Sequence, residues 1–280
     1  MISPLPHRLM GVRDLTSIFD TLLIDQFGVL HDGTAPYPGA VKALASLKAS
    51  GKKILLISNS GKRSAPNEQR LLHLGFEPGS WDVFLSSGEV AWRKLASSSD
   101  RSKRNCLLIA RDGDRSAIAG LDFNLVGDGA LADVVLLSGS EADHYDMDHY
   151  RRLLEPAAKR KVPCLCTNPD KIMLTPAGPR FGAGQIADAY AAMGGPVTWI
   201  GKPFPEIYEM AKAILRNPLG ARTACIGDSI EHDIAGGQQA GLSTVLVETG
   251  VLDTTSDSEK AELFKRYGAA PDYSLPAFVW

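Results

Sequence analysis

The chain has 280 residues, of which 44% are hydrophobic, and its 30 basic and 32 acidic residues leave a formal net charge of −2. This composition indicates a globular protein of one large or two ordinary domains and argues against wholesale disorder. Since there is no basic block, nothing favours a nucleic-acid or an anionic-membrane partner.

No apolar run reaches the length of a transmembrane helix, and the first twenty residues lack the continuous apolar stretch of a signal peptide. We therefore expect a cytoplasmic protein. Its cysteines, Cys106, Cys164, Cys166 and Cys225, lie mostly in apolar, strand-like runs. Such positions favour reduced, buried thiols over a metal site.

Short apolar, β-rich runs alternate with amphipathic stretches, which predicts an α/β fold with a parallel sheet and crossover helices. Strands are expected, in chain order, at 22–25, 53–58, 106–110, 134–138, 162–167, 223–227 and 244–247. Helices are expected at 39–50, 66–74, 88–96, 149–159, 186–193, 206–215 and 233–240, and a C-terminal helix is expected to start within the polar stretch 253–260. The serine-rich stretch 96–105 predicts a polar loop.

Polar side chains directly follow apolar runs at four points of this pattern. They are Asp25 in "LLIDQFGVL", Ser58 in "ILLISNSGK", Lys202 in "IGKPFPEIY", and Asp228 with Asp233 in "ACIGDSIEHDIAGG". Taken singly, each is explained as well by a helix cap or a turn. Because ligands bind beyond the carboxyl ends of strands in doubly wound sheets, the full set predicts a site that attacks and neutralises a phosphoryl group.

With these motifs the chain resembles the haloacid dehalogenase-like (HAD) hydrolase superfamily, in the class IIA branch of 4-nitrophenyl, nucleotide and pyridoxal-phosphate phosphatases. The resemblance extends over nearly the whole chain. Its motifs are "DQFGVLHDG" with "PGA" at 25–40, "SNSGKRS" at 58–64, "TNPD" at 167–170, "GAGQI" at 182–186, "GKP" at 201–203 and "GDSIEHDIAGGQQAGL" at 227–242. It implies a Rossmann-like core, placed at 1–86 and 195–280, and an inserted α/β cap at 87–194.

The resemblance also implies a role for each matching residue. Asp25 is the nucleophile that forms an aspartyl-phosphate, Ser58 bonds the transferring phosphoryl group, and Lys202 neutralises the nucleophile and the phosphate. The implied cofactor is Mg²⁺, a hard cation that prefers oxygen ligands. Its implied ligands are Asp25, Phe27 through its backbone carbonyl, Asp228 and Asp233. The implied substrate-binding residues are Gly28, Asn59, Ser60, Asn168 and Asp170.

Phe27 departs from the family pattern, since the phosphatases of this superfamily have a second aspartate two residues after the nucleophile. That aspartate protonates the leaving oxygen and later activates water, and phenylalanine can do neither. General acid–base catalysis contributes about 10²–10⁴ in rate, so roughly 3–5 kcal/mol is missing from the stabilisation of the transition state for a poor leaving group. Turnover of such substrates should be slow.

Three outcomes remain open at this stage. The protein hydrolyses phosphate esters whose leaving group needs no proton or recruits another acid and base, from among His31, Asp32, Asp170, Glu231 and His232. Alternatively it is a dehalogenase-like hydrolase, since superfamily dehalogenases carry an aromatic residue at the position of Phe27. Thirdly, it binds a phosphorylated metabolite without useful turnover.

The preferred reading is a hydrolase for a small phosphorylated metabolite. Related proteins often dimerise through the cap, which implies a homodimer that this sequence does not by itself establish. Substrate selectivity would lie in the cap.

Overall fold

The computed structural model describes residues 6–97, 104–175, 178–216 and 220–280. It separates into two compact units. Unit 1 takes in 1–58, 68–85 and 202–280, and unit 2 takes in 59–67 and 86–201, in each case as far as the residues are described.

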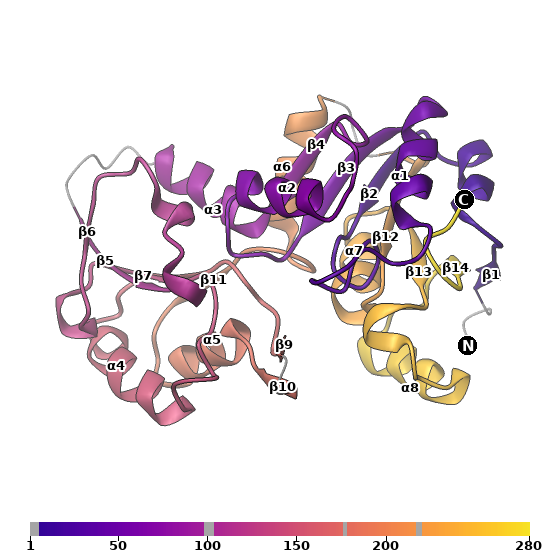
Figure 1. Cartoon of the computed structure of the whole chain (residues 1–280). Helices are drawn as coiled ribbons and strands as arrows, with labels where there is room; N and C mark the ends of the chain where they lie inside the picture. Colours follow the sequence, from indigo (N-terminus) through magenta and orange to yellow (C-terminus); the bar gives the residue numbers. More distant parts are fainter. Residues whose placement is uncertain (1–5, 98–103, 176–177, 217–219) are drawn as a thin grey trace. The chain divides into compact units, whose positions relative to one another are not determined.

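The described part of unit 1 is built on a seven-stranded sheet in the order β1-β14-β13-β12-β2-β3-β4 (Figure 1). The strands are β1 (His7–Arg8), β2 (Thr21–Ile24), β3 (Lys53–Ser58), β4 (Val83–Ser86), β12 (Thr223–Gly227), β13 (Ser243–Val247) and β14 (Tyr273–Leu275). The pairs β12–β2 and β2–β3 are parallel, with Ile24 opposite Ile226 and Leu56. The carboxyl ends of these three central strands therefore lie at one edge of the sheet.

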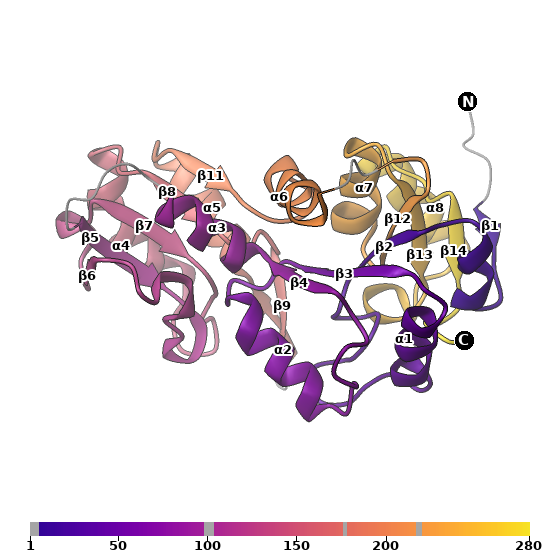
Figure 2. The same cartoon turned by 90° about the horizontal axis from the view of Figure 1, so that it is seen from above.

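Both faces of this sheet are covered by helices, which explains why its central strands are continuous apolar runs. Leu22 and Ile24 face the core cluster that contains Leu44 of α1 (Ala40–Ala49). Figure 2 shows α1 and α6 (Pro205–Leu215) on opposite sides of these strands. This is the doubly wound arrangement expected for a parallel sheet with crossover helices.

The rest of unit 1 consists of helical segments along the sheet. They are the 3₁₀ turns Val12–Ser17 and Gly250–Leu252, the π-helical turn Ile230–Ile234, α7 (Ala235–Gln239) and α8 (Asp257–Tyr267). Helix α2 (Ser64–His73) crosses the boundary between the two units in the chain.

Unit 2 has its own five-stranded parallel sheet in the order β11-β8-β7-β5-β6, together with a two-stranded hairpin, β9–β10. The strands are β5 (Arg104–Ile109), β6 (Phe123–Leu125), β7 (Val134–Leu137), β8 (Cys164–Cys166), β9 (Ile172–Thr175), β10 (Gly178–Phe181) and β11 (Val197–Trp199). Its helices are α3 (Ser87–Ala96), α4 (Met147–Lys159) and α5 (Ala183–Ala192), with 3₁₀ turns at Arg111–Gly113, Ser116–Ile118 and Gly129–Leu131. Side chains of α4, α5 and the sheet form a separate hydrophobic core.

The predicted α/β class with parallel sheets is confirmed, and every predicted strand and helix has a counterpart in the structure. Seven further strands were not predicted, and all of them have only two to four residues: β1, β4, β6, β9, β10, β11 and β14. The predicted helix 233–240 contains α7, and the helical run begins earlier than predicted, with the π-helical turn Ile230–Ile234. All four cysteines are buried and form no disulfide.

The predicted domain boundaries can be compared with the two units. The structure changes unit at 85/86 and 201/202, whereas the sequence analysis placed the cap at 87–194, and the short segment 59–67 groups with unit 2. The roles of core and cap stay a prediction. Of the predicted polar loop 96–105, residues 98–103 lie outside the described residues. Within the described ranges, no helix is long and apolar enough to cross a membrane.

Candidate active site

Three carboxylates converge at the carboxyl edge of the unit 1 sheet. Asp25 follows β2, Asp228 follows β12, and Asp233 lies in the π-helical turn after β12. One carboxylate oxygen from each lies within 4.8 Å of the others, and all three residues are buried. The parallel register of β2 and β12 explains this proximity, because it places Ile24 beside Ile226, two strand ends about 200 residues apart in the chain.

Lys202 lies among these carboxylates and is 2% exposed. Its Nζ atom is 2.7 Å from Oδ1 of Asp25 and 2.6 Å from Oδ1 of Asp233. The second oxygen of Asp233 accepts a hydrogen bond from the backbone N–H of Ser229, so the turn holds this carboxylate in place. A buried lysine bonded to two carboxylates stays charged.

The electrostatics of this cluster are unbalanced, since three carboxylates face one lysine. Burial raises the pKa of Asp25 to about 7; Asp233 adds to this rise and Lys202 opposes it. Burial and the charges of Asp25 and Asp233 also raise the pKa of Asp228 well above its ordinary value. For Lys202, burial alone would lower the pKa, but the two neighbouring carboxylates outweigh it and raise the pKa.

This imbalance fits a divalent cation. A cluster of buried carboxylate oxygens is a hard-donor set, and Mg²⁺ or a similar ion would supply the missing positive charge. Gly28 leaves the space that Asp228 needs: its φ is +80°, and a Cβ atom there would overlap the Asp228 carboxylate. The donors present therefore suit the cofactor implied by the sequence.

A segment that the sequence analysis did not recognise holds Asp228 from another side. The hydroxyl of Thr249 donates to the backbone carbonyl of Gly28 (2.6 Å), and the backbone N–H of Val251 donates to Oδ2 of Asp228 (2.8 Å). Thr249 and Val251 follow β13, the strand next to β12 in the sheet. The available signal was their place just beyond an apolar strand, in "VLVETGVLD".

The aromatic ring of Phe27 is 41% exposed and lies in the loop after β2. The rings of Phe27 and His31 make a T-shaped contact, with 4.9 Å between their centroids. A Cβ atom at Gly33 would lie 2.6 Å from the tip of the Phe27 ring, so a glycine there makes room for the aromatic side chain. The loop accommodates the phenylalanine where the family pattern has an aspartate.

Ser58, at the end of β3, belongs to unit 1 with the carboxylates, and it is 4% exposed. Its hydroxyl oxygen accepts a hydrogen bond from Nε2 of Gln26 (2.8 Å), and Gln26 is the direct neighbour of Asp25 in the chain. Gln26 was not among the predicted site residues, because a polar residue after a strand is common in ordinary loops. The structure shows that it links the loop after β2 to the end of β3.

Among the predicted replacements for the missing acid, two lie in the loop with Phe27. His31 is fully buried, and burial lowers its pKa to about 4, helped by the charge of Arg70. Asp32 accepts hydrogen bonds from Thr34 and from the backbone N–H of Ala35, which lower its pKa to about 2. Neither is poised to donate a proton near neutral pH, and both have structural partners.

The other two candidates in unit 1 lie in the π-helical turn after Asp228. The backbone N–H of His232 donates to Oγ of Ser229, and Nδ1 of the His232 ring is 3.2 Å from the same hydroxyl oxygen. Glu231 lies near Tyr267 of α8, and together with burial its carboxylate raises the pKa of the Tyr267 phenol. These contacts favour capping and packing over acid–base catalysis.

The remaining predicted substrate residues belong to unit 2. Nδ2 of Asn59 donates to Oδ1 of Asp170 (2.8 Å), and the backbone N–H of Asp170 donates to Oδ1 of Asn168 (3.2 Å). Oγ of Ser60 accepts from the backbone N–H of Lys62. The structure thus brings Asn59, Asn168 and Asp170 into one network, and their part in substrate binding stays a prediction.

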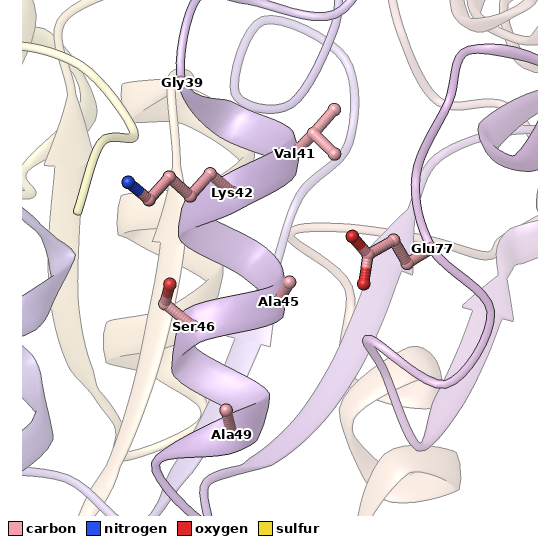
Figure 3. A pocket seen from close by; sticks show the side chains of 7 residues that line it. All are labelled: Gly39, Val41, Lys42, Ala45, Ser46, Ala49 and Glu77. Carbon is pink, nitrogen blue, oxygen red and sulfur yellow. The ribbon is translucent and has the colours of Figure 1, made fainter.

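A surface hollow elsewhere in unit 1 has no relation to these residues. Figure 3 shows it along the outer face of α1, where Val41 and Ala45 point toward Glu77. Its lining residues are Gly39, Val41, Lys42, Ala45, Ser46, Ala49 and Glu77. None of the predicted site residues is among them.

Two family models match this chain. A model of haloacid dehalogenase-like hydrolases matches residues 22–124, and a HAD-hydrolase-like model matches residues 199–278. Together the two ranges contain the residues that form the carboxylate cluster.

Individual relatives agree with these models. Chronophin of Bos taurus is 30% identical over 278 residues, which cover 94% of this chain and 91% of chronophin. The 5′-nucleotidase YutF of Bacillus subtilis is 29% identical and covers 85% of this chain and 91% of its own. The solved p-nitrophenyl phosphatase of Archaeoglobus fulgidus is 28% identical, with a TM-score of 0.74 and coverage of 92% and 96%.

The fold, the carboxylate cluster and these matches define a hydrolase of the HAD type. The chain belongs to the haloacid dehalogenase-like hydrolases, and within them to the class IIA phosphatases, as its sequence motifs predicted. It is a phosphoric monoester hydrolase of that family.

Proposed function

We propose that this protein is a Mg²⁺-dependent phosphatase that hydrolyses a small phosphorylated metabolite through an aspartyl-phosphate at Asp25. The observation that carries the proposal is the buried cluster of Asp25, Asp228 and Asp233 with Lys202 between them. The names of the relatives support phosphate-ester chemistry, since they include a 5′-nucleotidase and a p-nitrophenyl phosphatase.

The residues of unit 1 divide the work of phosphoryl transfer. A carboxylate oxygen of Asp25 forms a bond to phosphorus while the bond to the ester oxygen breaks, and the electron pair leaves with that oxygen. Lys202 balances charge on Asp25, and the Ser58 hydroxyl hydrogen-bonds the transferring group. Water then attacks phosphorus, which releases phosphate and restores the Asp25 carboxylate.

Asp25, Asp228, Asp233 and the backbone carbonyl of Phe27 are the groups that would hold the cation. When bound, Mg²⁺ supplies positive charge that offsets the buried carboxylates and the phosphate oxygens. Asp233 also keeps Lys202 in place through its 2.6 Å contact, so one carboxylate serves both the cation site and the lysine.

Phe27 limits the leaving groups that this site can expel rapidly. The phenylalanine has no proton to give, and the nearby His31 and Asp32 are engaged in structural hydrogen bonds. An alkyl leaving group must then depart as a poorly stabilised oxyanion, whereas an aryl or other acidic leaving group needs no proton. We expect turnover to fall steeply as the pKa of the leaving group rises.

The first test is the replacement of the nucleophile. In Asp25→Asn, phosphate release from any substrate found should fall below about a thousandth of the wild-type rate, because an amide cannot attack phosphorus. Malachite-green detection of phosphate, with Mg²⁺ and with EDTA, measures this. Asp32→Asn is the matched control, since its carboxylate serves a local turn, and it should keep activity.

The second test addresses Phe27. Phe27→Asp should raise turnover of an alkyl phosphate, such as a sugar phosphate, by about tenfold or more, since it restores an acid and base. Phe27→Asn is the matched control, because asparagine is similar to aspartate in size and is also polar but does not act as an acid or a base. A wild type that already cleaves alkyl phosphates at ordinary enzymatic rates, with no gain in Phe27→Asp, would contradict this argument.

The same assays separate the alternatives. Halide release without Mg²⁺ would indicate a dehalogenase-like hydrolase, which the carboxylate cluster and the phosphatase relatives disfavour. Tight binding of phosphate esters without any phosphate release, in the wild type and in Phe27→Asp, would indicate a phosphometabolite-binding protein.

The biological setting is also part of the proposal. We expect a small phosphorylated metabolite as the ligand, a cytoplasmic location, unit 2 as the cap that selects the substrate, and a homodimer through that cap. Light scattering coupled to size-exclusion chromatography, on the full chain and at micromolar concentration, tests the dimer directly.

A further inference from the structure

A chain of buried polar side chains connects the loop after β2 with the hydroxyl of Ser58. The side chains are His31, which is fully buried, Gln26, which is 2% exposed, and Ser58, which is 4% exposed. Burying polar groups is unfavourable unless they are hydrogen-bonded, and an apolar residue in place of Gln26 would fill the same space. The arrangement therefore calls for an explanation beyond packing.

The hydrogen bonds that join these three side chains share one donor-to-acceptor direction, from the loop toward Ser58. The backbone N–H of Gly33 donates to Nδ1 of His31 (2.9 Å), so Nδ1 carries no proton. A neutral imidazole then has its proton on Nε2, which is 3.3 Å from Oε1 of Gln26 and donates to it. The amide of Gln26 is thereby oriented with its NH₂ group toward Oγ of Ser58, to which it donates at 2.8 Å.

The direction matters for what the Ser58 hydroxyl can do. With Gln26 as donor, the Ser58 oxygen acts as the acceptor in this contact, so the contact with Gln26 does not use the hydroxyl hydrogen. With the amide reversed, Oε1 of Gln26 would compete for that hydrogen. A serine that serves a phosphoryl group must donate to it, since phosphoryl oxygens only accept.

The backbone of the loop holds the start of this chain. Both Leu30 and His31 donate their backbone N–H to the carbonyl of Gln26, at 2.8 and 3.2 Å, and Gly28 donates to the carbonyl of His31 at 3.0 Å. The ring of Phe27 contacts the ring of His31. The loop that carries the altered first motif therefore also carries the groups that orient Ser58.

We propose that Gln26 and His31 are positioning residues for phosphoryl transfer: His31 sets the orientation of the Gln26 amide, and that amide holds the Ser58 hydroxyl as a hydrogen-bond donor to the phosphoryl group. This role rests on the proposed phosphatase function. It concerns residues that neither transfer a proton nor bind the cation through their side chains.

The kinetic test is a double-mutant cycle with 4-nitrophenyl phosphate and Mg²⁺. Gln26→Met and His31→Phe nearly keep the side-chain volume but remove the hydrogen bonds that link His31, Gln26 and Ser58. Each should lower kcat about tenfold, with KM changed by less than about twofold. In the Ser58→Ala background, the same substitutions should change kcat by less than about twofold, because the hydroxyl they orient is gone. Equal losses in both backgrounds would overturn the proposal.

Gln238→Met is the matched control. Gln238 also lies in unit 1 and donates to a backbone carbonyl, that of Ala270, far along the chain from the loop after β2. It should lower stability without changing kcat. Thermal unfolding of every variant separates loss of folding from loss of positioning.

A second measurement does not depend on activity. The protein has six histidines, so ¹⁵N-histidine labelling with His31→Phe for assignment gives the His31 signals by NMR. The wild type should show an unprotonated Nδ1 and a protonated Nε2, and in a sample with ¹⁵N-labelled glutamine, assigned with Gln26→Met, Ser58→Ala should shift the Gln26 side-chain amide signals. A proton on Nδ1, or Gln26 signals that stay in place, would overturn the proposal even if the protein proves to release no phosphate.

Discussion

Phe27 and Gly33 depend on each other within the loop that follows β2. Gly33 has a φ of +102°, which favours glycine, and its missing Cβ leaves room for the tip of the Phe27 ring. Gly51 has a comparable φ of +79° but open space where a Cβ would lie. Substitutions at the two glycines can therefore be compared, because a new side chain is strained at both positions and meets another side chain only at position 33.

We predict that Gly33→Ala destabilises the protein more than Gly51→Ala. Backbone strain costs each variant about 1–2 kcal/mol, and at position 33 the new methyl group must also displace the Phe27 ring, which adds a further cost. Urea unfolding measures both. In a Phe27→Ala background the excess at position 33 should vanish, and an excess that persists would show that the ring is not its cause.

At the scale of elements, the segment after β13 helps to build the carboxylate cluster. In this segment the Thr249 hydroxyl donates a hydrogen bond to the backbone carbonyl of Gly28, and the backbone N–H of Val251 donates one to the Asp228 carboxylate. The strand β13 contributes no acidic group of its own to the cluster. Its contribution is to place this segment beside the end of β12.

Thr249→Val tests this role, because valine has the shape of threonine but no hydroxyl. We predict a loss of about 1 kcal/mol in folding free energy and a roughly tenfold weaker affinity for Mg²⁺, since Gly28 is no longer held beside Asp228. Calorimetric titration with Mg²⁺ measures the affinity. Thr254→Val, at an exposed position, is the control, and equal affinities in both variants would contradict the prediction.

At the scale of the whole molecule, stability should depend jointly on pH and on the cation. Burial raises the pKa of Asp25 from an ordinary 3.8 to about 7 in the folded protein without metal. Between these values the folded state binds more protons than the unfolded state. The metal-free protein therefore loses stability as pH rises from about 4 to about 7, and a cation competes with the proton for the same carboxylate.

We predict that Mg²⁺ raises the unfolding temperature much more at pH 8 than at pH 5.5, relative to EDTA. At a Mg²⁺ concentration of a hundred times its Kd, the free energy of unfolding would increase by about 2.7 kcal/mol at the higher pH. Differential scanning fluorimetry of the full chain measures the shift. Asp228→Asn should lose most of the effect, and a Mg²⁺ shift of the same size at both pH values would count against the carboxylate cluster as its site.

The α/β class and the central strands could be predicted because apolar runs and helical periodicity are local signals. Short strands such as β6 (Phe123–Leu125) and β14 (Tyr273–Leu275) were missed, since three residues carry too little pattern to stand out. Asp25, Asp228 and Lys202 could be predicted as neighbours because each stands at the end of an apolar run, and Asp233 because it shares a motif with Asp228. Gln26 and Thr249 could not be predicted, because their chemistry comes from partners far away in the chain.

The amino-acid sequence alone therefore determined the fold class, the family motifs and the replacement of an aspartate by Phe27, all of which are written in neighbouring residues. Only the tertiary structure decided that Asp25, Asp228 and Asp233 share one cluster, that Gly33 makes room for the Phe27 ring, and that Gln26 bonds Ser58. The physical reason is that strand register and loop closure bring together groups as much as 221 residues apart in the chain, and no local pattern encodes those contacts.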